Sequence, residues 1–286
     1  MKQGKESRTA VYVAMGRALA HGTTSATRFT DPTALALLPE DARRQVERAR
    51  AGTPPSGLRE RLARAVLRRR SKGMVARTIA IDDAVRGASS SQLVILGAGL
   101  DGRAFRMPEL RDVVVFEVDH PDSQRTKRAR AAALEPASRD LRFLPVDFAR
   151  DSLDDALAGA GHDPTRPTTW IWEGVVMYLT VEEIEATLAV VERRSAPSSR
   201  LIVAYHSPAL LLRVVGPLVR WVGEPLKSTQ QPEAMRALLA KHGFAVVSDE
   251  SLPTLAERLP EDIARAARIT KHFRIVTADK RPTAAG

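Results

Sequence analysis

Residues 92–119 constrain the fold of this chain more than any other stretch. They contain, in order, an apolar run at 93–96, a glycine turn, a second apolar run at 113–116 and an acidic end. The turn glycines are Gly97, Gly99 and Gly102, and the acidic residues are Glu117 and Asp119. A strand, a tight turn, a helix, a second strand and a carboxylate in this order are typical of open α/β sheets that bind an adenosine-containing cofactor. We therefore expect the chain to be organised around such a sheet.

Short apolar runs alternate with helical patterns from residue 93 to the end of the chain. The expected strands are 93–96, 113–118, 141–145, 168–172, 200–205, 244–248 and 273–278, and the clearest helices are 121–134, 181–195 and 232–242. Helical connections between short strands favour a largely parallel sheet with helices on both faces, and the last two strands have the character of a pair. We predict a Rossmann-like α/β fold with a mostly parallel seven-stranded sheet.

The first 88 residues have a different pattern. They are mostly helical and are interrupted by turns rich in Pro and Gly, which predicts an N-terminal helical cap or lid at 1–88 on a core at 89–286. Within the core, residues 207–227 are unusually apolar for a connection. They are either an extra core helix or an apolar lid that forms part of a substrate pocket.

The formal net charge of +10 comes largely from arginines, many of them between Arg43 and Arg77. Leu58, Leu62 and Val66 recur every four residues among them, so a solvated amphipathic helix with an apolar side beneath the arginines is the favoured interpretation. Nucleic-acid binding and attraction of an anionic substrate are the alternatives. Nucleic acid is disfavoured because no aromatic residue is interleaved with the arginines to stack bases.

Composition excludes several classes of chemistry. The chain has no Cys, which rules out disulfides, zinc-thiolate sites, iron–sulfur clusters and a Cys nucleophile, and no metal site is predicted. No apolar run of about 18 residues is present, and the first residues lack the apolar segment of a signal peptide. We expect a cytoplasmic protein without membrane contact. Nothing in the sequence assigns an oligomeric state.

The glycine turn alone does not identify the cofactor. Gly97, Gly99 and Gly102 satisfy the dinucleotide pattern G-x-G-x-x-G, and an acidic residue follows about twenty positions later, so an NAD(P)-dependent oxidoreductase is a serious alternative. A pyrophosphate requires a helix of several turns after the third glycine. Here Pro108 ends any such helix early.

Three carboxylates carry more weight than the glycines. Asp119, Asp147 and Glu173 follow three of the predicted strands, and parallel sheets bind ligands at that edge. Carboxylates accept hydrogen bonds from a ribose diol, an adenine amine and an ammonium group, and they offset the charge of a sulfonium. S-adenosylmethionine has all four features, whereas a pyrophosphate would be repelled by these carboxylates.

Four motifs in the same order carry a family resemblance: LGAGLDGRAFR, FEVDHP, LPVDF and WEGVVMYL. With them the chain resembles, roughly from Arg17 to Asp279, the leucine carboxyl methyltransferase-like family of class I S-adenosylmethionine-dependent methyltransferases, in its bacterial O-methyltransferase branch. The commoner family form has Thr at the position of Gly102.

The resemblance implies a class I methyltransferase fold and a role for each motif residue. It implies that Gly97, Ala98 and Gly99 approach the methionine portion, Asp119 binds the ribose, Asp147 and Phe148 flank the adenine, Glu173 lies by the methionine end and Arg77 pairs with the methionine carboxylate. Structural roles remain open for several of these residues. The glycines can serve the turn alone, Asp147 can cap a helix, and Arg77 can be a solvated helix residue.

The expected reaction is in-line transfer of a methyl group from S-adenosylmethionine to an oxygen of a small molecule. The resemblance suggests a carboxyl or hydroxyl acceptor in secondary metabolism. A carboxylate needs no base, whereas a hydroxyl benefits from one, and His206 after the fifth predicted strand is the leading candidate. A packing or hydrogen-bonding role for His206 is the alternative. The residues assigned to the substrate pocket are Tyr178, Tyr205 and Trp221.

Overall fold

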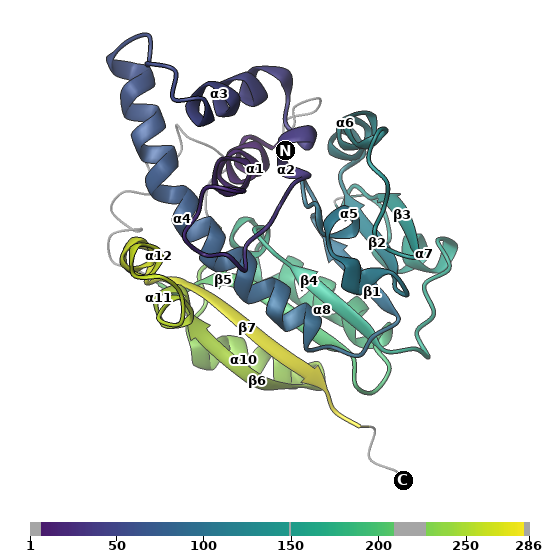
Figure 1. The fold of residues 1–286 in the computed structure, drawn as a ribbon. Coiled ribbons are helices and arrows are strands. Elements are labelled where there is room, and N and C mark those ends of the chain that lie inside the picture. The colour runs from purple at the N-terminus through teal and green to yellow at the C-terminus, as the bar shows by residue number, and fades with distance from the viewer. Residues whose placement is uncertain (1–6, 149, 209–226, 283–286) are drawn as a thin grey trace.

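The computed structural model describes residues 7–148, 150–208 and 227–282. Its centre is a seven-stranded sheet (Figure 1). The strands are β1 (Gln92–Leu96), β2 (Val114–Asp119), β3 (Asp140–Pro145), β4 (Thr168–Trp172), β5 (Arg200–His206), β6 (Phe244–Ser251) and β7 (Phe273–Lys280). Their order is β3-β2-β1-β4-β5-β7-β6, and only β7 runs antiparallel to its neighbours β5 and β6. The expected mostly parallel seven-stranded sheet is confirmed, as is the pairing of the last two strands.

Helices cover both faces of the sheet. They are α1 (Arg8–Ala20), α2 (Ala34–Leu37), α3 (Glu40–Arg50), α4 (Leu58–Arg86), α5 (Arg103–Arg106), α6 (Pro121–Ala131), α7 (Leu153–Gly159), α8 (Val181–Arg193), α10 (Pro232–Lys241), α11 (Leu252–Ala256) and α12 (Glu261–Ala267). Short 3-10 turns lie at η1 (Pro108–Leu110), η2 (Val176–Tyr178) and η3 (Arg268–Thr270). Within the described residues, none of these helices combines the length and the apolarity that crossing a bilayer requires.

Alternation along the strands divides the interior into two cores. In β1, Leu93 and Ile95 point to one face, where they join residues of α1, α4, α11 and α12. Val94 and Leu96 point to the other face and pack with α7, α8 and α10. Every residue of β1 is buried because helices lie on both sides, which explains its continuous apolar run.

The N-terminal helices share a core with the sheet. α4 is one continuous helix of 29 residues; its N-terminal end lies beside α3, and further along it crosses a face of the sheet and contacts α12 and β7 (Figure 1). Buried residues of α1 and α4 belong to the same apolar cluster as Leu93 and Ile95. The mostly helical character of the first 88 residues is confirmed, while the division into a cap and a core at residue 88 stays a prediction.

Two expectations from the apolar patterns are wrong. The helix expected at 121–134 ends at Ala131. The stripe of Leu58, Leu62 and Val66, expected to lie beneath the arginines, is 69%, 58% and 49% exposed. α4 instead buries its opposite side, beginning at Leu67 and continuing along the helix at Ser71, Met74, Val75 and Thr78. Of the apolar segment predicted at 207–227, residues 209–226 lie outside the described residues.

Candidate functional site

A large cavity of about 1480 Å³ lies at the carboxyl ends of the parallel strands. Residues that follow β1, β2, β3 and β4 line it, together with residues of α1 and α4. β1 and β4 are neighbours in the sheet, and the chain moves outward in opposite directions from them, which is where open α/β sheets bind their ligands. Binding sites for drug-sized ligands typically occupy about 300–1,000 Å³. This cavity therefore has room for a cofactor and a second molecule.

The glycine turn after β1 is held by β2. Gly97 and Ala98 donate their N–H groups to the carbonyl oxygen of Val118 at 2.8 and 3.0 Å, and Gly99 donates to Asp119 Oδ2 at 2.5 Å. Gly97 has φ +70°, and a Cβ atom added there would collide with Val175. These three N–H groups are already used by the protein, so they do not form the free cradle that a pyrophosphate needs.

Gly102 has a different reason to be glycine. Its φ of −109° is accessible to any residue, but an added Cβ would collide with Thr33 Oγ1. The third glycine of the dinucleotide-like pattern therefore serves contact with the α1–α2 connection. Its helix, α5, has only four residues and ends before Pro108, as the sequence predicted.

Asp119 is fixed with its carboxylate at the cavity wall. Besides the bond from Gly99, it accepts the N–H of His120 at Oδ1 over 2.6 Å. Burial raises the pKa of Asp119, and the two backbone hydrogen bonds counter that rise. Both oxygens retain further acceptor capacity, which suits a vicinal diol.

Asp147 and Phe148 lie in the turn after β3 and both line the cavity. The alternative role of Asp147 as the N-cap of the next helix is wrong, because Ser152 caps α7 through a bond from Asp155 N–H. The Asp147 N–H instead donates to Asp151 at 2.8 Å. Phe148 is 46% exposed, so it offers an aromatic face beside a carboxylate.

Glu173 meets two arginines at the end of β4. Its Oε1 lies 2.7 Å from Arg77 Nε, and its Oε2 lies 3.0 Å from Arg103 Nη1. Burial alone would raise the pKa of Glu173, but the guanidinium groups of Arg77 and Arg103 outweigh it and hold the pKa below its usual value. Arg77 is thus one of two arginine partners of this carboxylate, and it also lies over the Phe273 ring at 5.5 Å.

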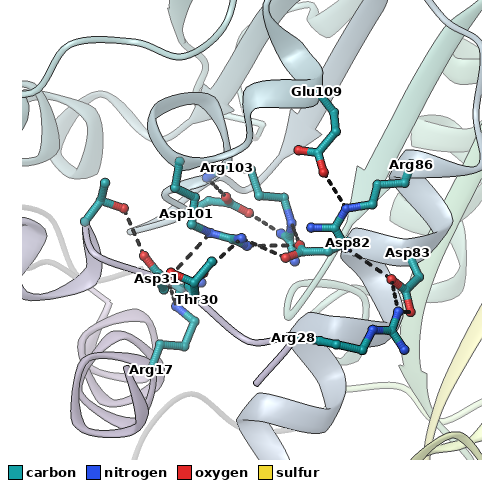
Figure 2. Close-up of polar contacts among 12 residues, drawn as sticks. Arg17, Arg28, Thr30, Asp31, Asp82, Asp83, Arg86, Asp101, Arg103 and Glu109 are labelled. Atoms are coloured by element: carbon teal, nitrogen blue, oxygen red, sulfur yellow. Dashed lines mark hydrogen bonds and ion pairs between the residues drawn. The ribbon is translucent and has the colours of Figure 1, made fainter. Parts of the chain in front are cut away.

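Arg103 connects the site to α4. Its guanidinium is fully buried and pairs with Asp82 at 2.8 Å and with Asp101 (Figure 2). It also pairs with Glu173. These carboxylates hold the pKa of Arg103 well above its usual value, against burial, which lowers it. Arg106 shares Asp82 at 2.7 Å.

The same network reaches α1. Arg17 pairs with Asp31 at 3.1 Å (Figure 2). It also donates to the Leu100 carbonyl oxygen at 2.5 Å. Asp31, Asp82 and Arg103 were not predicted as site residues from the sequence. The charged residues Asp101, Arg103 and Arg106 within LGAGLDGRAFR were a usable signal that a buried ionic network lies there. Charged side chains in a turn between buried strands require buried partners.

His206, at the end of β5, lines the cavity as expected. Its ring packs edge-on against Phe273, with ring centroids 5.1 Å apart. Burial lowers the pKa of His206 to about 4, and the charge of Arg77 adds to that effect. Within the described part of the chain, its Nδ1 atom has no hydrogen-bond partner.

The three residues assigned to the substrate pocket have different outcomes. Tyr178 lines the cavity, with its hydroxyl 3.4 Å from Thr9 Oγ1. Tyr205 was assigned wrongly: it points into the core on the other face, is fully buried and donates to Asp249 Oδ2 at 2.8 Å. Side chains alternate along β5, so Tyr205 and His206 cannot both face the cavity. Trp221 lies outside the described residues.

The sheet order, the antiparallel β7 and the carboxylates at the ends of three parallel strands define the architecture of class I methyltransferases. A crystal structure from Thermobifida fusca YX, named as a putative methyltransferase, has this fold: it superposes with a TM-score of 0.61 at 16% identity and covers 98% of this chain and 97% of its own.

The sequence comparisons identify the family. The model of the family "Leucine carboxyl methyltransferase" matches residues 10–192, and the chain belongs to that family. A "Putative S-adenosyl-L-methionine-dependent methyltransferase" of Mycolicibacterium gilvum is 39% identical over 54% of this chain, and the match spans only about half, 51%, of that relative. A relative with the same description from Frankia alni is 33% identical over 72% of this chain and 71% of its own length.

Both relatives are described as S-adenosylmethionine-dependent, and S-adenosylmethionine is the cofactor expected for this chain from the sequence. Membership of a methyltransferase family argues against the nicotinamide alternative. Its structural weakness is also clear, since the turn N–H groups are used by β2 and α5 is too short to present a pyrophosphate site.

Proposed function

We propose that this protein is an S-adenosylmethionine-dependent methyltransferase that methylates an oxygen of a small molecule, a carboxyl or hydroxyl group, in secondary metabolism. The observation that carries the proposal is the continuous cavity from Asp119 past Glu173 to His206 and Phe273. It joins a set of groups suited to the cofactor with a second, more apolar region large enough for an acceptor.

The cofactor end matches S-adenosylmethionine in its donor and acceptor groups. Asp119 suits the ribose hydroxyls, Asp147 the adenine amine and Phe148 the adenine ring. Gly97, Ala98 and Gly99 allow close approach of the methionine chain. Arg77 and Glu173 carry the opposite charges that an amino-acid carboxylate and ammonium require. Bound S-adenosylmethionine supplies an electrophilic methyl group on a sulfonium.

The acceptor end is mostly apolar. Val13, Met74, Leu252 and Phe273 contribute side chains to the wall, and the Tyr12 hydroxyl is buried with no hydrogen-bond partner in the described chain. An acceptor with an apolar body and a polar group fits this lining. Exclusion of water and alignment of the acceptor oxygen are then the main contributions of the protein to the rate.

The environment of His206 favours a carboxylate acceptor. Because burial lowers its pKa to about 4, His206 is neutral at pH 7 and is a weak proton acceptor. A carboxylate is already ionised and requires no proton transfer. For a hydroxyl acceptor, His206 remains the candidate base, because its position at the end of β5 places it in the lining of the cavity.

Cofactor binding is tested by thermal unfolding in the presence of S-adenosylhomocysteine, with NADH as the comparison. A ligand that binds only the native state raises the unfolding temperature, so S-adenosylhomocysteine should raise it and NADH should not. No stabilisation at saturating concentration would refute the proposal.

The acceptor class is tested with paired acids and alcohols of the same carbon skeleton, with S-adenosylhomocysteine release as the readout. His206→Asn should leave methylation of the acid within about twofold and lower that of the alcohol by about a hundredfold or more. Methylation of alcohols that is insensitive to this change would exclude His206 as the base.

A further inference from the structure

The N-terminal half of α4 presents an apolar stripe to solvent. Leu58, Leu62 and Val66 are spaced at i, i+4 and i+8, so they lie on one side of the helix. They are three of the seven large apolar residues that are exposed in the described chain, and no other helix has more than one. Isolated exposed apolar residues need no explanation, but a row of them on one helix does.

Exposed arginines border this stripe on both sides. Arg59 and Arg70 follow one edge of the helix, and Arg61 and Arg68 follow the other. The single carboxylate in this half of α4, Glu60, is taken by Arg64 at 2.9 Å and by Arg48 at 3.5 Å. In the part of the chain that the structure describes, Arg59, Arg61 and Arg69 have no ion-pair partner.

The stripe continues along α4 to residues that line the cavity. The 3.6-residue period places Arg69 and Gly73 on the same side of α4 as Leu62 and Val66, and both Arg69 and Gly73 line the cavity. Ile269, which is 53% exposed, and Lys271 line the same cavity from the segment after α12. Apolar and cationic groups therefore continue from the exposed end of α4 to the wall of the cavity.

The charges decide between possible occupants of the stripe. A second copy of the chain would bring two rows of arginines together, which is repulsive. Single-stranded nucleic acid would require aromatic side chains for stacking, and α4 has none. An anionic lipid surface satisfies both features, because acyl chains take up the apolar side chains and the headgroups take up the cations.

We propose that the stripe of Leu58, Leu62 and Val66, with its flanking arginines, docks this protein on the surface of membranes that contain anionic lipid. The sequence expectation of no membrane contact relied on the lack of a spanning segment, and peripheral docking needs none. The proposal depends only on the exposed residues of α4. It stands whether the acceptor is an acid or an alcohol.

The test is co-sedimentation of the full chain with vesicles. Vesicles of equal parts phosphatidylglycerol and phosphatidylcholine should bind the protein, pure phosphatidylcholine should bind it much more weakly, and high salt should release it. The variant L58S/L62S/V66S should bind the mixed vesicles about tenfold more weakly, and R59Q/R61Q should also weaken binding. V247S is the matched control, because Val247 is 61% exposed but lies on β6.

Thermal stabilisation by S-adenosylhomocysteine verifies that each variant is folded. Binding of the triple variant at the level of the unmodified protein would overturn the proposal, as would equal affinity for the two kinds of vesicle. The stripe would be assigned to a second copy of the chain if two results held together. The unmodified protein would have to self-associate in light scattering without binding vesicles, and the triple variant would have to abolish that self-association. Salt-sensitive RNA binding without vesicle binding would assign it to nucleic acid.

Discussion

Asp119 is the residue on which cofactor binding depends most directly. Its carboxylate is oriented by the N–H groups of Gly99 and His120 and lies at the cavity wall. Asp119→Ala removes the acceptor for the ribose hydroxyls and releases the Gly99 N–H from its partner. We expect it to abolish the thermal shift caused by S-adenosylhomocysteine. Asp112→Asn, at an exposed surface position, should keep the full shift. A full shift in Asp119→Ala would remove Asp119 from the ribose role.

Arg103 is expected to matter most for stability. It is fully buried against Asp82, Asp101 and Glu173, and only a planar guanidinium can meet three carboxylates in this arrangement. Arg103→Lys keeps the charge but leaves carboxylate oxygens without donors. Loss of a buried ionic partner typically costs about 3–5 kcal/mol in the free energy of unfolding. Urea unfolding should show that Arg103→Lys loses about 3 kcal/mol of unfolding free energy, near the lower limit of that range. The exposed Arg111→Lys should change the unfolding free energy little. Equal losses in both variants would contradict the assignment.

At the scale of elements, the turn between β1 and α5 combines two constraints. Gly97 adopts φ +70°, and Val175 occupies the space that a Cβ atom would need. Gly97→Ala should therefore weaken S-adenosylhomocysteine binding and lower stability by about 1–2 kcal/mol from the backbone conformation alone. Calorimetry and urea unfolding measure the two effects. The double variant Gly97→Ala/Val175→Ala removes the collision but keeps the cost of the backbone conformation. Its cofactor-product binding and stability should therefore recover only part of what Gly97→Ala loses. Full recovery would mean that the conformation of Gly97 is unimportant.

The elements that could be predicted from the sequence are those with a local signal. All seven strands were found because each is a short apolar run, and the ends of β1, β2, β3 and β4 led to Gly97, Asp119, Asp147 and Glu173. Arg77 and Phe148 came from the family resemblance. The errors at Tyr205 and at the Leu58, Leu62 and Val66 stripe concern partners distant in sequence. Tyr205 follows the side-chain alternation of β5 into the opposite core, and the exposure of Leu62 depends on which side of α4 meets α1.

The ionic network escaped prediction for the same reason. Asp31, Asp82 and Asp101 come from three separate segments, and only the fold brings them around Arg103 and Arg106. A sequence can indicate that a buried charge needs a partner, but it does not say which one. The helical spacing that placed Arg77 on α4 would have placed Asp82 there as well.

For the whole molecule, we expect stability to fall in mild acid through its buried histidines. Burial lowers the pKa of His162 to about 4, whereas the unfolded value is about 6.5. The folded state therefore binds fewer protons than the unfolded state between these values, and stability is lost as the pH falls from about 6.5 to about 4. His206 acts in the same direction. Glu117 acts in the opposite direction, because burial raises its pKa to about 7.

A difference measurement isolates His162 from these other groups. His162→Gln preserves a polar partner for Thr168, which the imidazole contacts at 3.0 Å, and it does not titrate. The loss of unfolding free energy between pH 7 and pH 5 should be smaller in this variant than in the unmodified protein, as measured by urea unfolding at each pH. An identical loss would mean that His162 does not titrate in this range.

The continuity of α4 also fixes the distance between its exposed end and the cofactor site. Because α4 is an uninterrupted helix that rises about 1.5 Å per residue, position 62 at its exposed end is about 22 Å from Arg77 at the cofactor site. The chain has no Cys, so a thiol introduced at position 62 would be the only one available for labelling. The emission of a fluorophore there would report binding at the exposed end of the helix. Its energy transfer to a fluorescent cofactor analogue would report the distance from that end to the cofactor site in the same molecule.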